Sequence, residues 1–185
     1  MKRPYLLPDP HFCERTHKHY QKIRDWCQRP ANFNDRLFKG LSRLTTDDIL
    51  ICLGDICFGN NDLLHQMYIM PLKCTKILVR GNHDKQTNSY YYKHGWDFVC
   101  TTFRDKYFGK NILFSHKPKV WDGYYDYNIH GHFHNLPIER WETELTAVMT
   151  DKHILMSCEN SNYQPVSLNS LIDKLTKENN ESTPK

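Results

Sequence analysis

Two short apolar runs, residues 49–53 and the Ile-Leu-Val that follows Lys76, limit the folds that are open to this chain. The first run, Ile-Leu-Ile-Cys-Leu, has no polar position, which is typical of a strand covered on both faces. The segment between the runs has helical spacing, and its predicted inward residues are Leu63, Leu64, Met67 and Met70. A strand, a helix and a second strand in this order predict a parallel βαβ unit and an α/β fold.

The remaining apolar patterns add helices around this unit and a second group of strands. Helices are predicted over residues 15–28, 33–44, 61–70, 87–94 and 168–175. Further short strands are predicted at residues 5–8, 98–107, 112–114, 127–129 and 154–156. Gly109 and Lys110 form a hairpin turn signal, so the second half favours antiparallel pairing and the whole chain an α/β fold with mixed sheets. One domain over residues 1–175 is expected, followed by a disordered tail over 176–185, which has no apolar residue.

Composition excludes several classes of protein. The 185 residues are 39% hydrophobic and 25% charged, the balance of a soluble globular protein. The longest apolar run is far shorter than the about 20 residues that span a bilayer, and no segment resembles a signal peptide, so a cytoplasmic location without membrane contact is expected. The seven cysteines include no C-x-x-C pair, which favours free, buried thiols. A net charge of +4 is weaker than that of most nucleic-acid-binding proteins.

Polar residues that can bind metal ions follow five of the predicted strands. They are Asp9-Pro10-His11, Gly54-Asp55, Gly81-Asn82-His83-Asp84, Ser115-His116 and His130-Gly131-His132-Phe133-His134. In open α/β sheets, ligands bind beyond the carboxyl ends of the strands. Asp, His and Asn side chains suit Zn, Mn, Fe or Ni better than Ca. The sequence therefore predicts a site for divalent metal ions at one edge of the sheets.

Each motif also has an ordinary structural interpretation when it is taken alone. Gly-Asp after a strand is most often a turn, and a single Ser-His is most often a core or surface histidine. The segment 131–134 is more specific, because residues two apart in an extended segment point to the same side. His132 and His134 can therefore converge on one place. Five such motifs at successive strand ends favour the functional interpretation over the structural one.

The series of motifs resembles the calcineurin-like metallophosphoesterase superfamily, and in particular its small single-domain bacterial and phage members. The resemblance extends over residues 5–175 and includes Asp9-Pro10-His11-Phe12, Cys27-Gln28-Arg29-Pro30, Leu53-Gly54-Asp55 and Tyr163-Gln164-Pro165-Val166-Ser167-Leu168. It implies a sandwich of two mixed β-sheets flanked by helices, with two divalent metal ions at the strand ends. Manganese is one of the ions that the resemblance suggests.

The resemblance also implies a role for each motif residue. Asp9, His11 and His134 would hold the first metal ion, and Asn82, His116 and His132 the second. Asp55 would bridge the two ions. His83 would not bind metal but would face the leaving group as a general acid.

This division agrees with elementary electrostatics. Asp9 and Asp55 carry −2 against about +4 from two divalent ions, so the site would attract a phosphate. A hydroxide bridging the ions can attack phosphorus in line, and an imidazole can protonate the leaving oxygen. Asp84 either reaches the ring of His83 or caps the helix that follows, and His130 either supports a ligand or packs as an ordinary core residue.

The substrate is less well determined by the sequence. Arg80, Lys117, Tyr124 and Tyr125 are predicted to bind it, because aromatic side chains stack on bases while Lys and Arg contact phosphate. A nucleotide is the specific hypothesis, and a plain lid over the site is the alternative for residues 117–127. The expected activity is hydrolysis of phosphodiesters or phosphomonoesters. A nuclease acting on nucleic acid and a non-catalytic binding scaffold of the same fold are the other two hypotheses.

Overall fold

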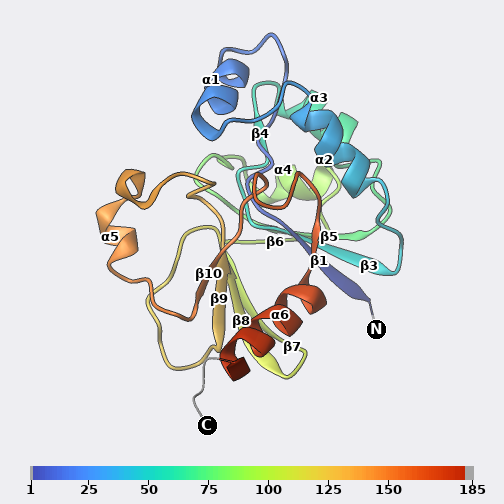
Figure 1. Ribbon diagram of the computed structural model, residues 1–185. Coiled ribbons are helices and arrows are strands. Elements are labelled where there is room, and N and C mark those ends of the chain that lie inside the picture. Colours follow the sequence, from blue (N-terminus) through green and yellow to red (C-terminus); the bar gives the residue numbers. More distant parts are fainter. Residues whose placement is uncertain (1, 182–185) are drawn as a thin grey trace.

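The computed structural model describes residues 2–181 as two stacked β-sheets, with most of the helices on the outer side of the larger sheet (Figure 1). The larger sheet has the strand order β11-β1-β3-β5-β6, the second has the order β10-β9-β8-β7, and β2 pairs with β4. The strands are β1 (Arg3–Leu7), β2 (Phe12–Cys13), β3 (Asp48–Cys52), β4 (Cys57–Phe58), β5 (Thr75–Val79), β6 (Phe98–Cys100), β7 (Thr102–Tyr107), β8 (Lys110–Ser115), β9 (Tyr127–His130), β10 (His153–Leu155) and β11 (Val166–Ser167).

The two main sheets are both mixed. In the larger sheet β1, β3, β5 and β6 are parallel and β11 is antiparallel to β1. In the second sheet β8, β9 and β10 are parallel and β7 forms an antiparallel hairpin with β8. The helices are α1 (Lys18–Cys27), α2 (Phe33–Leu41), α3 (Asn61–Tyr68), α4 (Asn88–Lys93), α5 (Thr143–Thr146), α6 (Leu168–Glu181) and the 3-10 turn η1 (Ile138–Arg140). The predicted fold class is confirmed.

Strand β3 is buried on both faces, as its uniform apolar sequence predicts. Leu50 and Cys52 belong to the core that packs against α1 and α2, whereas Ile51 and Leu53 belong to the core between the sheets. Alternate side chains of a strand point to opposite faces, so one apolar run serves both layers. Leu168 and Ile172 of α6 close the second core from the side.

The predicted strand over residues 98–107 is two strands in different sheets. β6 pairs with β5 in the larger sheet, and β7 pairs with β8 in the second. The chain bends at Thr101 and crosses from one sheet to the other there. Thr101 and Thr102 are β-branched and suit a strand, so the local sequence does not reveal the change of partner.

The prediction of which side chains of α3 face inward is mostly wrong. Only Leu64 of the four predicted residues is buried, and His65 is buried beside it, while Leu63, Met67 and Met70 are exposed. The helix contacts β2 and β4, which are a narrow pair of strands rather than a broad sheet. A narrow support covers only a thin stripe of a helix, so a wide apolar face remains in solvent.

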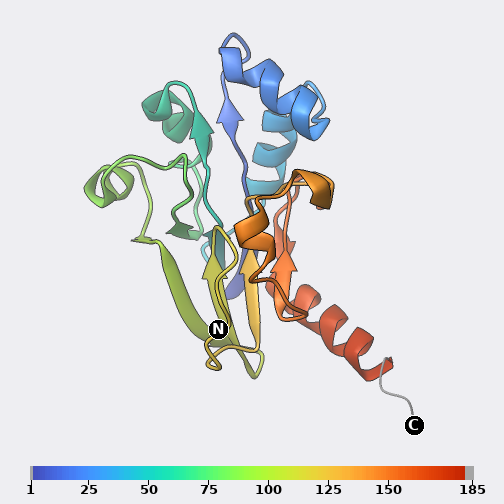
Figure 2. The ribbon, with the colours of Figure 1, turned by 90° about the vertical axis from the view of Figure 1, so that its left-hand side faces the viewer.

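The C-terminal helix is longer than its apolar pattern predicts. α6 continues through residues 176–181, which were expected to begin a disordered tail, and its last turns extend away from the rest of the molecule (Figure 2). The other predicted tail residues, 182–185, lie outside the described residues. All seven cysteines are free, as predicted. Within residues 2–181, no helix is both long and apolar enough to cross a bilayer.

Candidate metal centre

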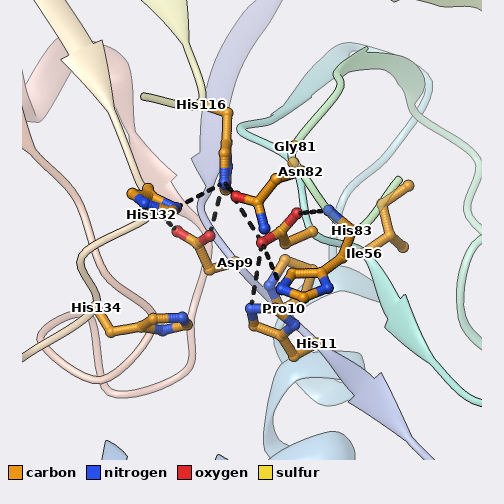
Figure 3. A network of polar contacts seen from close by, with 12 residues as sticks. Asp9, Pro10, His11, Ile56, Gly81, Asn82, His83, His116, His132 and His134 are labelled. Carbon is orange, nitrogen blue, oxygen red and sulfur yellow. Dashed lines mark hydrogen bonds and ion pairs between the residues drawn. The ribbon is translucent and has the colours of Figure 1, made fainter. Parts of the chain in front are cut away.

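The structure brings together all the predicted metal ligands at one edge of the sandwich (Figure 3). They follow strands of both sheets, so neither sheet alone could form the site. The larger sheet contributes residues after β1, β3 and β5, and the second sheet contributes residues after β8 and β9. The seven side chains are those of Asp9, His11, Asp55, Asn82, His116, His132 and His134.

Asp9, His11 and His134 form the first cluster. Each offers one ligand atom, and these three atoms lie within 4.8 Å of one another. All three side chains are buried. Asp9 accepts a hydrogen bond from the backbone N–H of His132 (2.8 Å) through Oδ2, but its buried Oδ1 has no hydrogen-bond partner in the described part of the chain. This oxygen lies 3.6 Å from Nδ1 of His116, too far for a hydrogen bond. A buried carboxylate oxygen without a hydrogen bond is costly, so this cluster fits a bound cation.

The second cluster surrounds Nε2 of His116. The other nitrogen, Nδ1, lies 2.8 Å from the carbonyl oxygen of Leu53 and donates to it. Nε2 then faces Oδ1 of Asn82 (2.9 Å), Nδ1 of His132 (3.2 Å) and Oδ2 of Asp55 (3.4 Å). One proton on Nε2 can satisfy only part of this group of acceptors, whereas a divalent ion can be bound by all of them. The residues therefore fit a second metal ion.

Asp55 lies between the two clusters. Its Oδ2 is 3.7 Å from Nε2 of His11 in the first cluster and 3.4 Å from Nε2 of His116 in the second. Its Oδ1 accepts a hydrogen bond from the backbone N–H of His83 (2.8 Å), which holds the carboxylate in place. This is the position that a carboxylate shared by two ions requires.

Backbone strain is concentrated in the same residues. Of the nine non-glycine residues with positive φ in the described chain, five are predicted ligands: Asp9 (45°), His11 (46°), Asp55 (52°), His132 (75°) and His134 (54°). This region of backbone conformation costs a non-glycine residue on the order of 1–3 kcal/mol. Strain of this kind persists where the surrounding structure holds a functional geometry, so the distribution supports a functional site.

Two glycines leave room for the carboxylates. A Cβ atom on Gly81 would lie 2.1 Å from Oδ1 of Asp55, and one on Gly131 would lie 2.2 Å from Oδ2 of Asp9. Any side chain at either position would displace a carboxylate that the site uses. The glycines in these two motifs thus have a packing role.

The clusters already attract positive charge without metal. Burial lowers the pKa of His116, but its hydrogen bond to Asp55 and the charge of Asp9 outweigh this and raise the pKa to about 9. Burial likewise opposes the charged form of His134, yet hydrogen bonds with Cys27 and Glu159 raise its pKa to about 10. The buried carboxylates of the two clusters thus favour a positive charge beside them.

The pKa values of the two carboxylates, Asp9 and Asp55, shift in opposite directions. Burial raises the pKa of Asp9 to about 6, although the charges of His116 and His134 oppose it. Burial also acts on Asp55, but its hydrogen bonds from His116 and from the backbone N–H of His83 hold its pKa below the ordinary value. Burial lowers the pKa of His11 well below its usual range, so this ring is neutral and its nitrogens can act as ligands.

Sequence reasoning missed two residues, Arg29 and Glu159, whose buried side chains hold the first cluster. Arg29 donates hydrogen bonds to the carbonyl oxygens of Asp9 (2.8 Å) and Pro10 (2.6 Å) and to the carboxylate of Glu159 (2.7 Å). Glu159 in turn lies 3.4 Å from Nδ1 of His134. A carboxylate that binds one nitrogen of a metal-ligating histidine orients the ring. Arg29 lies in a segment that carries the family resemblance, but no sequence pattern singles out Glu159.

Glu142 plays the corresponding part in the second cluster. Its Oε2 is 2.7 Å from Nε2 of His132, which leaves Nδ1 of that ring facing His116. Lys117, which was predicted to bind substrate, lies 3.2 Å from both oxygens of Glu142. The lysine therefore supports the residue that orients His132.

Asp84 has neither of the two roles considered from the sequence. Its carboxylate accepts hydrogen bonds from the backbone N–H groups of Asp55 (2.7 Å) and Gly81 (2.8 Å). The helix α4 is capped by Thr87 instead. Asp84 thus joins the loop after β3 to the loop after β5 and positions the bridging carboxylate through the backbone. His83 contacts Asp55, not Asp84, through its backbone N–H.

His130 packs as a core residue. Its ring lies beside those of Phe133 and His153, with centroids 6.1 Å and 6.2 Å away. Nδ1 is 3.0 Å from the carbonyl oxygen of Gly131, and within the described residues Nε2 has no hydrogen-bond partner. The functional alternative required a hydrogen bond from His130 to a predicted ligand. The hydrogen bonds of His130 do not reach one.

His83 is exposed, as is Asn82, whereas the other six predicted ligands are buried or half-buried. The side chain of His83 is 42% exposed, and its Nε2 lies 3.9 Å from Oδ2 of Asp55. The ring meets the ring of Phe58 edge-on, with centroids 4.6 Å apart. His83 therefore stands at the rim of the centre, where a bound molecule could reach it.

A cavity of about 380 Å³ opens beside the two clusters. It is lined by His11, Asp55, Asn82, His83, His132, His134, Phe58 of β4, and His19, Lys22, Ile23 and Trp26 of α1.

None of the four predicted substrate-binding residues is among the described residues that line this cavity. Arg80 donates to the carbonyl oxygen of Asp84 (2.7 Å), and Tyr125 is buried with its hydroxyl on the carbonyl oxygen of Lys119. Tyr124 is exposed beside Arg104. Closeness to His116 in the sequence does not bring these side chains to the centre, because the segment folds over the second sheet.

Comparison with known proteins agrees with this fold and site. The family model for calcineurin-like phosphoesterases matches residues 5–180, and the chain belongs to that family. It is 28% identical over 188 residues to an uncharacterized protein of Methanocaldococcus jannaschii, across 96% of this chain and 93% of that protein. The crystal structure of a protein of unknown function from Aquifex aeolicus has a TM-score of 0.70 and 26% identity, covering 95% of this chain and 100% of that one. The fold and the site thus define the general class of metal-dependent phosphoesterases.

Proposed function

We propose that the protein hydrolyses phosphodiester or phosphomonoester bonds with two divalent metal ions. The observation that carries this proposal is the pair of ligand clusters with Asp55 between them. Asp9, His11 and His134 would hold one ion, and Asn82, His116 and His132 the other. Divalent ions at such a centre polarise phosphoryl oxygens and make water nucleophilic at neutral pH.

Side chains of the protein would confine the phosphoryl group, protonate the leaving oxygen and orient the metal ligands. Asn82 and His132 line the cavity as well as the second cluster, so they help to confine the phosphoryl group. His83 is exposed to the same cavity and lies outside both clusters, where it can give a proton to the leaving oxygen. Glu142 holds the ring of His132 through Nε2, which faces away from His116, and Glu159 contacts Nδ1 of His134.

Metal removal tests this proposal. Dialysis against a chelator is expected to abolish hydrolysis of bis(4-nitrophenyl) phosphate and 4-nitrophenyl phosphate, because Asp9 and Asp55 cannot hold a phosphate without the ions. Adding back Mn²⁺, Ni²⁺, Zn²⁺ or Mg²⁺ in parallel should restore activity with at least one of them, at about two equivalents per chain by elemental analysis. Hydrolysis that survives complete removal of metal would contradict the proposal.

Metal affinity is expected to depend on pH. His116 and His134 have raised pKa values of about 9 and about 10 in the metal-free protein, so both carry a proton at pH 7. A histidine binds metal only after losing that proton. Apparent affinity for Zn²⁺ should therefore rise from pH 6.5 to 9, by up to about tenfold per pH unit for each proton displaced. Calorimetry in buffers of different ionisation enthalpy measures the released protons, and an affinity independent of pH would contradict the assignment.

A further inference from the structure

One face of α1 forms a wall of the cavity beside the metal centre. His19, Lys22, Ile23 and Trp26 are spaced at i, i+3, i+4 and i+7, which places them on one side of the helix. Ile23 is buried toward the core, whereas the side chain of Trp26 is 56% exposed. Trp26 therefore lies beside the candidate metal centre with an exposed side chain that a bound molecule can contact.

A row of aromatic rings connects this wall to the first cluster. Phe58 stacks on His11 with centroids 4.7 Å apart and planes 9° from parallel. On its other side Phe58 stacks on His19, with centroids 4.9 Å apart and planes 19° from parallel. All three rings line the cavity, but the stack continues to His134 at one end and His17 at the other, so their faces are covered. A border of ring edges therefore runs from the metal centre to α1, where Trp26 is exposed.

The position of His83 shows which part of a substrate would meet this border. The ring of His83 contacts Phe58 and lines the same cavity. Because His83 is proposed to protonate the leaving oxygen, the leaving group must lie on the side of Phe58 and α1. Lys22 is the one lysine or arginine among the described residues that line the cavity, and its charge suits an oxygen-rich group at the outer end.

We propose that Trp26 stacks on a flat aromatic group, such as a nucleobase, carried by the leaving group of the phosphoester, and that Ile23 and the ring edges of Phe58 and His19 border that group. This inference rests on the proposed function. Aromatic side chains accept any base by stacking. The cavity of about 380 Å³ is near the lower end of the roughly 300–1,000 Å³ of ligand pockets, which suits one nucleoside better than a long acyl chain.

The proposal determines which bond breaks. Water adds its oxygen to phosphorus, and the bond between phosphorus and the nucleoside oxygen is cleaved. The departing oxygen takes a proton from His83, which regains one from water. Adenosine 5′-(methyl phosphate) should therefore yield adenosine and methyl phosphate, rather than adenosine 5′-phosphate and methanol.

Binding of non-hydrolysable analogues tests directly whether the exposed face of α1 binds a base. The probes are the 5′-methylene phosphonate of adenosine and the matching phosphonate of ribose, which lacks only the base. Metal-loaded wild-type protein is expected to bind the adenosine compound about tenfold more tightly, an effect within the range measured for a stacked base. Trp26→Ala should remove most of this difference and leave the ribose compound unaffected.

Trp121→Ala is the matched control. Trp121 is 49% exposed, close to the exposure of Trp26, but it lies in the segment that folds over the second sheet and does not line the cavity. This variant should keep the full preference for adenosine. A melting curve of each variant checks its folding, because about half of each tryptophan is buried and Trp121 also donates a hydrogen bond to the carbonyl oxygen of Tyr125.

Three results would overturn the inference: equal binding of the two phosphonates by wild type, loss of the preference in Trp121→Ala instead of Trp26→Ala, or tighter binding of a decyl phosphonate than of the adenosine compound. Adenosine 5′-phosphate and methanol as the products would also overturn it. Failure of the proposed function would be seen separately, as absence of metal-dependent hydrolysis of the nitrophenyl esters, which do not depend on a nucleobase.

Discussion

Replacing Asp55 with asparagine is expected to remove both metal ions from the protein. The carboxylate lies within 3.7 Å of one histidine nitrogen from each cluster, so neither ion would keep its full negative counter-charge. The amide oxygen of asparagine can still accept the hydrogen bond from His83, so the loop should remain folded. Elemental analysis should show a loss of both equivalents, and kcat/KM should fall at least about 100-fold, since even residues behind the ligands cost 10–100-fold.

Two variants serve as comparisons for Asp55→Asn. His116→Ala should affect mainly the second ion, because His116 belongs to one cluster only. Asp35→Asn changes an exposed carboxylate on α2 that pairs with Arg15, and it should leave metal content unchanged. If Asp55→Asn keeps two equivalents of metal, the bridging role is wrong.

His83→Ala is expected to separate acid catalysis from metal binding. The side chain lies at the rim of the cavity and belongs to neither cluster, so the variant should retain two metal ions. Its kcat should fall by about 10²–10⁴ on substrates with an alkoxide leaving group, which is the usual cost of a lost general acid. The loss should be smaller with a nitrophenolate leaving group, because nitrophenolate departs with little protonation.

Two measurements decide the role of His83: metal stoichiometry and the dependence of kcat on the leaving group. The nitrophenyl ester is an internal control for folding and metal loading in the same sample. A variant that loses a metal ion would make His83 a ligand. A variant that slows both kinds of substrate equally would give His83 a structural role, and either outcome would contradict the proposed mechanism.

The fold and the grouping of the predicted ligands could be predicted because they depend on local patterns. Apolar runs such as residues 49–53 mark buried strands, and the carboxyl ends of neighbouring parallel strands meet at one edge. Polar residues directly after those strands are therefore close in space, regardless of the conformation of the loops that follow. The two glycines at the site are also visible as motif residues, and the structure adds the close approach of Asp55 and Asp9 that requires them.

The border of the cavity could not be predicted, because it depends on how helices pack. Residues 117–127 follow His116 in the sequence but fold over the second sheet, away from the cavity. Trp26 of α1 is separated from most of the predicted ligands in the sequence, yet α1 lies beside them because Tyr20, Ile23 and Cys27 pack into the core. The periodicity of apolar residues predicts the buried face of a helix, but it does not predict which exposed face will border a site.

The sequence by itself determined the α/β class, the mixed sheets and which residues meet at the strand ends, since hydrophobic periodicity and strand direction are properties of single segments. Only the tertiary structure decided which side chains hold the site in place. Arg29 and Glu159 are more than a hundred residues apart, and they meet because buried charges must be paired where several loops converge. The wall that faces a substrate was likewise set by packing between α1 and the sheet, where apolar burial, not proximity in the sequence, determines the neighbours.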